Sequence, residues 1–160
     1  MKILVVGKGG REHALISALK ESPVETELYC FPGSDAIESL AESVNVDGLV
    51  GLIEWMSANE IDLCVAGEES YLVKGDGLAT QCEKAGIPCW GPHKESAQLE
   101  ASKEFAKEFM LRHGIPTGAA VGCADIDEAR AAINGVYPTV LKFDGLAAGK
   151  GVAVCADEAS

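Results

Sequence analysis

Several features are missing from this sequence, and each absence excludes a class of protein. No apolar run approaches the ~18 residues that a membrane-spanning helix needs. The first apolar stretch, residues 3–6, is too short for a signal peptide, so we expect a cytoplasmic protein with no membrane partner. Basic residues are not in excess either, because 13 lysines and arginines stand against 25 aspartates and glutamates. The resulting net charge of −12 argues against a nucleic-acid partner, which requires a basic face.

Cysteines are present but are not arranged in pairs. The six cysteines include no C-x-x-C pair, and no histidine lies near them at metal-binding spacing. Several of them interrupt apolar runs, which is typical of small buried side chains in a reducing compartment. We therefore expect unpaired thiols, several of them buried.

Two common nucleotide-binding motifs are also absent. A P-loop requires G-x-x-x-x-G-K-[ST], but the spacing from Gly145 to Gly149 is one residue too short and Gly151 replaces the hydroxyl residue. The dinucleotide fingerprint G-x-G-x-x-G begins at Gly7 but has Glu12 in place of its third glycine. The sequence therefore predicts neither a Walker loop nor an NAD site.

What is present over residues 1–100 is an alternation of strands and helices. The first strand, residues 2–6, is a continuous apolar run of the kind that is buried on both faces of a parallel sheet. Residues 7–10, GKGG, then lead into a helix whose apolar residues 14, 15, 18 and 19 form one stripe. A phosphate at this helix start is plausible because free N–H groups point out of it. Further strands are expected at 27–31, 44–46, 61–66 and 87–90, and further helices at 48–59 and before Gly86. The pattern predicts a Rossmann-like α/β domain with a parallel sheet.

A second domain is expected from residue 101 onward. Gly91-Pro92 interrupts the pattern, a short helix follows at 94–100, and Ser102 can cap the next helix, which runs to His113. After it we expect a strand at 118–123, a helix at 126–133 capped by Asp125, and two strands joined by a glycine-rich loop.

The glycine-rich loop is the stretch with the clearest chemical content. Residues 145–151 contain three glycines, which let backbone N–H groups approach an anion closely. Lys142 in the preceding strand and Lys150 in the loop add positive charge. The alternative is a glycine-rich hairpin with solvated lysines, and spacing alone leaves both open.

Residues 142–152, KFDGLAAGKGV, resemble the nucleotide-covering hairpin of the ATP-grasp enzymes, specifically of the phosphoribosylamine–glycine ligase family. Other segments similar to that family, in order, are GKGGREHA at 7–14, PGS at 32–34, GP at 91–92, AQLE at 97–100, SK at 102–103 and HGIPT at 113–117. One segment departs from it. Residues 67–72 are GEESYL where the family has G-P-E-x-P-L, so Glu69 and Leu72 are kept but both prolines are lost. We expect a less rigid loop there.

The resemblance implies a ligase of de novo purine biosynthesis that joins glycine to 5-phosphoribosylamine. ATP would be cleaved to ADP and phosphate through a glycyl phosphate intermediate, so the partners would be small molecules. ATP and Mg²⁺ would be the cofactors, with the metal ligands expected beyond residue 160 and none in this chain. No catalytic residue and no oligomeric state can be assigned from the sequence.

The resemblance also implies which residues bind ligands. The expected ATP-binding residues are Lys103, Lys142, Asp144, Gly145, Leu146, Ala147, Ala148, Gly149, Lys150 and Gly151. The expected substrate-binding residues are Gly9, Gly10, Arg11, Glu12, Pro32, Gly33 and Glu69. Lysines suit this role because phosphoryl transfer depends on positioning and on neutralising the phosphate oxygens. The loop would also exclude water, which would hydrolyse an acyl phosphate. Lys103 could instead be a solvated residue in the first turn of its helix.

We therefore expect an N-terminal α/β domain at 1–100 and the first part of an ATP-grasp domain, truncated, at 101–160. Such a fragment should have no ligase activity alone. The alternative belongs to another class: a short, non-catalytic module that binds a phosphorylated sugar at the glycine turn.

Overall fold

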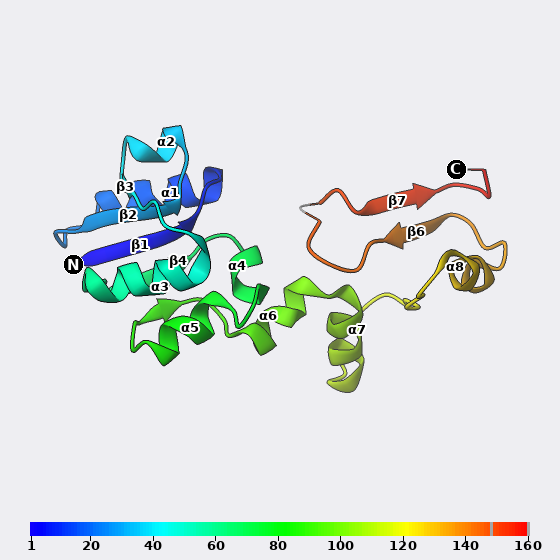
Figure 1. Ribbon diagram of the computed structural model, residues 1–160. Coiled ribbons are helices and arrows are strands. Elements are labelled where there is room, and N and C mark those ends of the chain that lie inside the picture. The colour runs from blue at the N-terminus through cyan, green and yellow to red at the C-terminus, as the bar shows by residue number, and fades with distance from the viewer. Residues whose placement is uncertain (148, 160) are drawn as a thin grey trace. The chain divides into compact units, whose positions relative to one another are not determined.

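The computed structural model of this chain describes residues 1–147 and 149–159 (Figure 1). They fall into two compact units, Met1–Ala97 and Gln98–Ser160, which we call unit 1 and unit 2. No helix in the described part of the chain has the length and apolar character needed to cross a membrane. Ala148, one of the expected ATP-binding residues, lies outside the described residues.

Unit 1 is built on a five-stranded parallel sheet, which confirms the α/β prediction. The strand order is β3-β2-β1-β4-β5. Its elements are β1 (Lys2–Gly7), α1 (Gly10–Lys20), β2 (Glu27–Pro32), α2 (Asp35–Glu38), β3 (Glu42–Ser43), α3 (Gly48–Ala58), β4 (Leu63–Ala66), α4 (Ser70–Val73), α5 (Leu78–Lys84) and β5 (Cys89–Trp90). Helix α6 (Lys94–Ala101) runs across the limit between the two units.

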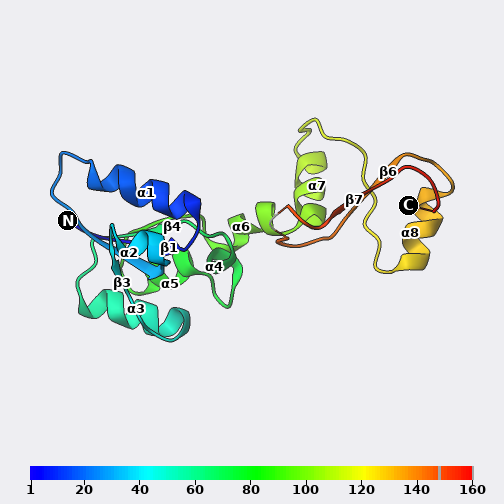
Figure 2. The ribbon, with the colours of Figure 1, turned by 90° about the horizontal axis from the view of Figure 1, so that it is seen from above.

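The sheet is buried on both faces because β1 is apolar at every position from Ile3 to Val6. Successive side chains of a strand point to opposite faces, so Ile3 and Val5 join one core and Leu4 and Val6 the other. The first core lies under α1 and α2, and the second under α3 and α5 (Figure 2). This arrangement is the doubly wound layering that continuous apolar strands predict.

The buried face of α1 differs from the predicted stripe. Leu15 and Leu19 pack against the core beside the buried Ile16, whereas Ala14 and Ala18 are exposed. The larger aliphatic side chains face the sheet because they remove more apolar area from water than alanine does.

Two strand predictions were wrong: one strand lies at other residues, and the other does not form. The edge strand β3 pairs through Glu42 and Ser43 rather than through residues 44–46, although the N–H of Val44 still donates to the carbonyl of Cys30. Residues 118–123 form no strand in the structure, and Val121 is exposed. A strand requires a neighbouring ladder, and β propensity cannot supply one.

Unit 2 contains α7 (Lys103–Arg112), α8 (Ile126–Ile133) and an antiparallel ribbon of β6 (Thr139–Lys142) and β7 (Val152–Cys155). Both predicted N-caps are confirmed. The Ser102 hydroxyl accepts from the N–H of Phe105, and the Asp125 carboxylate accepts from the N–H groups of Asp127 and Glu128. The register pairs Lys142 with Val152, as a hairpin around the glycine loop requires.

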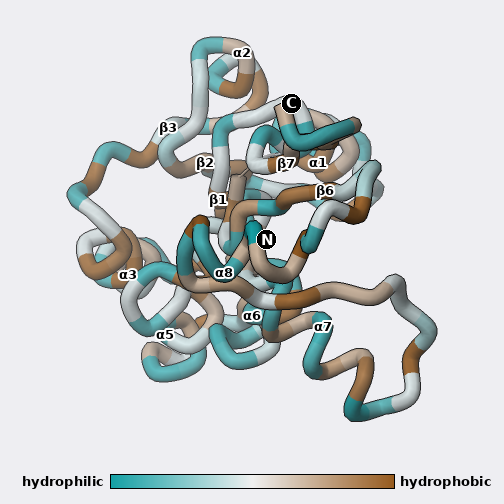
Figure 3. Tube along the Cα trace, turned by 90° about the vertical axis from the view of Figure 1, so that its right-hand side faces the viewer, coloured by the Kyte–Doolittle hydropathy of each residue, from teal (hydrophilic) through white to brown (hydrophobic). Residues whose placement is uncertain are grey.

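The ribbon of unit 2 is rich in apolar residues, as the hydropathy colours along β6 and β7 show (Figure 3). Val140, Leu141, Val152 and Val154 are exposed, whereas Cys155 is buried. Within the described residues, the ribbon is therefore held by its backbone ladder more than by a core.

Candidate functional site

The first candidate site lies at the carboxyl ends of β1 and β4. β1 and β4 are neighbours in the sheet, but the chain leaves them towards opposite edges. From β1 it goes on to β2 on one side, and from β4 it goes on to β5 on the other. Open α/β sheets bind ligands at such a switch point. Here residues 7–10 follow β1 and residues 67–69 follow β4. We call these two loops and the start of α1 the switch-point corner.

The switch-point corner is organised around Glu12, which is only 3 % exposed. Its side chain fills the space left by two glycines at the ends of the strands. A Cβ on Gly7 would lie 2.5 Å from Glu12 Cγ, and a Cβ on Gly67 would lie equally close to that atom. Gly7 also has a φ of +138°, which side chains disfavour. Glu12, which stands in place of the third glycine of the dinucleotide fingerprint, thus fills the space left by the missing side chains of Gly7 and Gly67.

Glu12 is held by hydrogen bonds rather than left as an isolated charge. Its Oε2 accepts from the N–H of Gly9 at 2.7 Å, and its Oε1 accepts from Arg11 Nε at 3.0 Å. Arg11 Nη2 donates to Glu69 Oε2 at 2.7 Å, which joins α1 to the loop after β4. This hydrogen bond from Arg11 lowers the pKa of Glu69. Arg11, Glu12 and Glu69, which the sequence analysis assigned to substrate binding, therefore lie together.

The switch-point corner retains capacity for an anion. Arginine has five N–H donors, and the two ion pairs use two of them. The Arg11 side chain is 58 % exposed, and the N–H groups of Gly10 and Arg11 begin the helix without intrahelical acceptors. The two carboxylates oppose an incoming phosphate, so the geometry favours weak rather than tight binding.

The expected Pro32-Gly33 contact lies beside the same glycine turn. The N–H of Gly33 donates to the carbonyl of Gly7 at 3.3 Å. Gly33 has a φ of +74°, and a Cβ there would lie 2.6 Å from Cys30 Sγ. The glycine is therefore required by the backbone, whatever it contacts.

In unit 2, Asp144 ties the glycine loop to the start of α7. Its carboxylate accepts from the Ser102 hydroxyl at 2.9 Å and from the backbone N–H groups of Lys103 and Glu104. The Lys103 ammonium returns a hydrogen bond to the carbonyl of Gly145 at 2.8 Å. Asp144 and Lys103, both of which were expected to bind ATP, thus hold the glycine loop against the start of α7.

The other expected ATP-binding residues that the structure describes are exposed lysines, glycines that the loop geometry requires, and half-buried apolar residues. Lys142 and Lys150 are exposed, and their ammonium groups have no partner among the described residues. Gly145 and Gly149 have φ values of +137° and +76°, so both need glycine. Leu146 and Ala147 are half-buried, and a Cβ on Gly151 would lie 2.8 Å from Ala147 Cβ.

The contact of Asp144 with α7 should weaken at low pH. Partial desolvation raises the pKa of Asp144, but the hydrogen bonds from Ser102, Glu104 and Lys103 outweigh it and lower the pKa below the ordinary value of an aspartate. The stabilisation is therefore complete above that value and is lost as the pH falls through the lowered pKa. We expect the amide signals of Lys103 and Glu104 to shift in an NMR pH titration with a midpoint lower than that of an ordinary aspartate. In Asp144→Asn that titration should vanish, and its persistence would assign the shift to another group.

Sequence reasoning missed two features. It did not pair Ser102 with Asp144, and it treated the cysteines as separate buried residues although three of them gather in unit 1. Ser102 and Asp144 are 42 residues apart in the sequence, and the three cysteines lie on three separate elements, so neither pattern is visible locally.

Comparisons with known proteins identify relatives of both units. Residues 1–100 match the family described as phosphoribosylglycinamide synthetase, N domain, and residues 101–160 match the ATP-grasp (A) domain of the same synthetase. A phosphoribosylamine–glycine ligase of Allochromatium vinosum is 45% identical over 165 residues, covering 100% of this chain and 38% of the relative. The trifunctional purine biosynthetic protein adenosine-3 of Drosophila melanogaster is 44% identical, covering 98% of this chain and 12% of its own length.

Solved structures give the same picture. The crystal structure of phosphoribosylamine–glycine ligase from Thermotoga maritima has a TM-score of 0.74 and 28% identity, covering 98% of this chain and 36% of that one. An N5-carboxyaminoimidazole synthetase from Staphylococcus aureus, complexed with ADP, has a TM-score of 0.75 at 17% identity, which shows the fold alone. The chain spans about 38% of the length of the ligases it matches.

Proposed function

The chain belongs to the phosphoribosylglycinamide synthetase family, and we propose that it supplies the substrate corner and the nucleotide hairpin of a phosphoribosylamine–glycine ligase. The reaction would join glycine to 5-phosphoribosylamine in the cytoplasm, with ATP cleaved to ADP and phosphate through a glycyl phosphate. Its substrates would be small molecules, and its place would be in de novo purine biosynthesis.

The observation that carries this proposal is the switch-point corner. A phosphorylated sugar amine needs an anion site that leaves the amine free to attack. Arg11 has donors to spare, and the first N–H groups of α1 point out of the same corner. Glu69 holds the guanidinium in place across the loop.

The nucleotide role rests on unit 2. The exposed ammonium groups of Lys142 and Lys150 can neutralise phosphate oxygens, which is most of what phosphoryl transfer needs from a protein. Lys103 would reach a phosphate only by exchanging its hydrogen bond to Gly145. The fit to magnesium is poor, since no cluster of three carboxylates occurs among the residues described here. We therefore assign no magnesium ligand and no catalytic residue to this chain.

The switch-point corner should bind a sugar phosphate weakly. We expect ribose 5-phosphate at millimolar concentration to shift the backbone NMR signals of residues 7–13, because the ligand meets Arg11 and the helix start. Added salt should weaken the binding, since exposed charges are screened. Arg11→Ala should reduce it by about tenfold, the loss of one charge-assisted contact.

Arg130→Ala, which removes an exposed arginine from α8, is the matched control and should leave the titration unchanged. If residues 7–13 do not shift, the glycine turn has only a structural role.

A hybrid enzyme tests the ligase proposal directly. Residues 1–160 would replace the matching 38% of the Allochromatium vinosum relative, and ADP release would be measured with glycine and freshly made phosphoribosylamine. We expect ADP release that requires both substrates. A folded hybrid that binds ribose 5-phosphate but releases no ADP would favour the non-catalytic sugar-phosphate module instead.

A further inference from the structure

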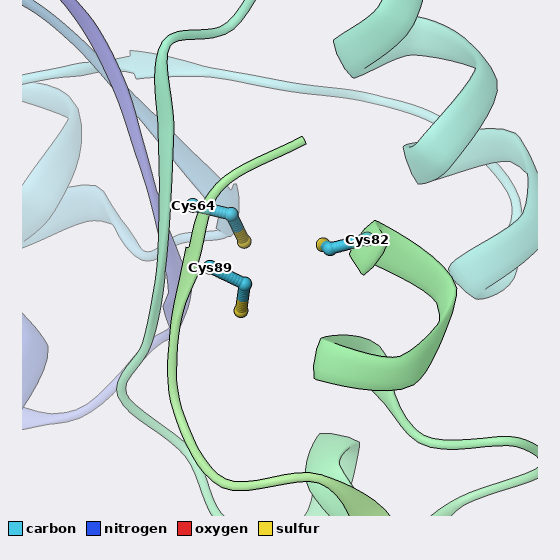
Figure 4. A group of neighbouring side chains, drawn as sticks. All are labelled: Cys64, Cys82 and Cys89. Carbon is cyan, nitrogen blue, oxygen red and sulfur yellow. The ribbon is translucent and has the colours of Figure 1, made fainter. Parts of the chain in front are cut away.

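Three cysteine side chains of unit 1 converge on one point (Figure 4). Cys64 lies in β4, Cys82 in α5 and Cys89 in β5. Their Sγ atoms all lie within 4.8 Å of one another, and all three thiols are free. We call this group the cysteine triad.

The backbone fixes the three positions independently. Cys64 and Cys89 are register partners on neighbouring parallel strands, so their side chains leave the same face of the sheet. The N–H of Cys64 donates to the carbonyl of Pro88 at 2.9 Å, and the N–H of Ile87 donates to the carbonyl of Cys82 at 2.9 Å. These two hydrogen bonds tie the turn between α5 and β5 to Cys64 on one side and to Cys82 on the other. A ligand would find this triad largely preformed.

The surroundings of the triad are apolar. Cys64 and Cys82 are fully buried in the core that includes Leu78, Ala79 and Ile87, and Cys89 packs against it half-buried. No carboxylate or imidazole belongs to the group among the described residues. Sulfur is therefore the ligand offered, which selects soft ions over magnesium or calcium.

Cys89 is the member of the triad that is closest to solvent, because it is half-buried whereas Cys64 and Cys82 are fully buried. Each thiol must lose its proton to become a ligand, since the thiolate is the form that binds metals.

We propose that Cys64, Cys82 and Cys89 form a three-thiolate site for a soft divalent metal ion of the zinc class. Zinc–sulfur bonds of about 2.3 Å in tetrahedral geometry place sulfur atoms roughly 3.8 Å apart. The observed spacing therefore needs to close by no more than about 1 Å. A divalent ion leaves a net charge of −1 on three thiolates, whereas a monovalent ion would leave −2, which is costlier to bury.

Binding involves no change of oxidation state. Each thiol that becomes a ligand gives its proton to the buffer as a metal–sulfur bond forms, and the fourth position stays open to water. Metal binding should therefore acidify a weakly buffered solution and stabilise unit 1, because the ion binds the folded state.

The test is a titration of the full, phosphine-reduced chain with Cd²⁺, followed by displacement with Zn²⁺. We expect thiolate-to-cadmium charge-transfer absorption that saturates at one ion per chain, with a rise in the melting temperature of unit 1. Cys89→Ser, at the half-exposed position, should weaken Cd²⁺ binding by more than about 100-fold, because even outer-shell changes at metal sites cost 10–100-fold. Cys64→Ala and Cys82→Ala should do the same without burying a hydroxyl.

Cys30→Ala is the matched control, because Cys30 is equally buried but belongs to the core on the other face of the sheet. Cys123→Ser controls for an exposed thiol in unit 2. Both controls should bind Cd²⁺ like the unaltered chain. The proposal is overturned if one equivalent of Cd²⁺ gives no charge-transfer band, or if Cys89→Ser binds as tightly as Cys30→Ala.

Discussion

Gly67→Ala is expected to destabilise unit 1 by about 3 kcal/mol or more, a change of over 100-fold in its unfolding equilibrium. A Cβ at this position would lie 2.5 Å from Glu12 Cγ, 2.6 Å from Glu12 Oε1 and 2.8 Å from the carbonyl oxygen of Val6. Glu12 cannot swing away, because it is buried and holds the N–H of Gly9 and the guanidinium of Arg11. Val6 cannot move either, since it lies within β1, between β2 and β4.

Urea unfolding followed by the circular dichroism of unit 1 measures this effect. Gly51→Ala is the matched control, because a Cβ there meets only Val46 Cβ at 3.5 Å and Gly51 lies inside α3. That substitution should stabilise the chain by about 0.5–1 kcal/mol through helix propensity. If the two variants unfold at the same urea concentration, Glu12 is not held as tightly as its hydrogen bonds indicate.

Lys142→Ala in the hybrid ligase is expected to lower kcat/KM for ATP by about ten- to hundred-fold. A charge-assisted contact to phosphate contributes roughly 1.5–3 kcal/mol, which corresponds to that range. Lys142 suits the role because its ammonium group is exposed on β6 and has no partner among the described residues. The side chain therefore gives up no hydrogen bond when a nucleotide arrives.

Steady-state ADP release at varied ATP concentration measures this prediction. Lys20→Ala, at the exposed end of α1, is the control and should leave the kinetics unchanged. Lys142→Arg should retain part of the activity, because it keeps the charge but changes its geometry. Kinetics unaffected by Lys142→Ala would mean that the lysine points into solvent throughout the reaction.

The local elements of this chain could be predicted because their causes lie within a few residues. Residues 3–6 are apolar without a break, so β1 had to be a strand buried on both faces. Ser102 and Asp125 stand next to the first turn of the helix that each one caps, and both caps were found at those positions. The glycine loop between two apolar runs likewise predicted the β6–β7 hairpin.

Only the tertiary structure decided which distant residues meet. It placed Glu12 against Gly67, Asp144 against Ser102, and Cys64 beside Cys82 and Cys89. It also turned α1 so that Leu15 and Leu19, rather than the alanines, face the core, and it left residues 118–123 without a strand.

The physical reason is the range of the interactions. Helix caps, turns and hydrophobic periodicity act between residues that are close along the chain, so their energies can be judged from the sequence. The meeting of Glu12 with Gly67 or of Cys64 with Cys89 depends on strand order and register, which are fixed by the packing of the whole sheet.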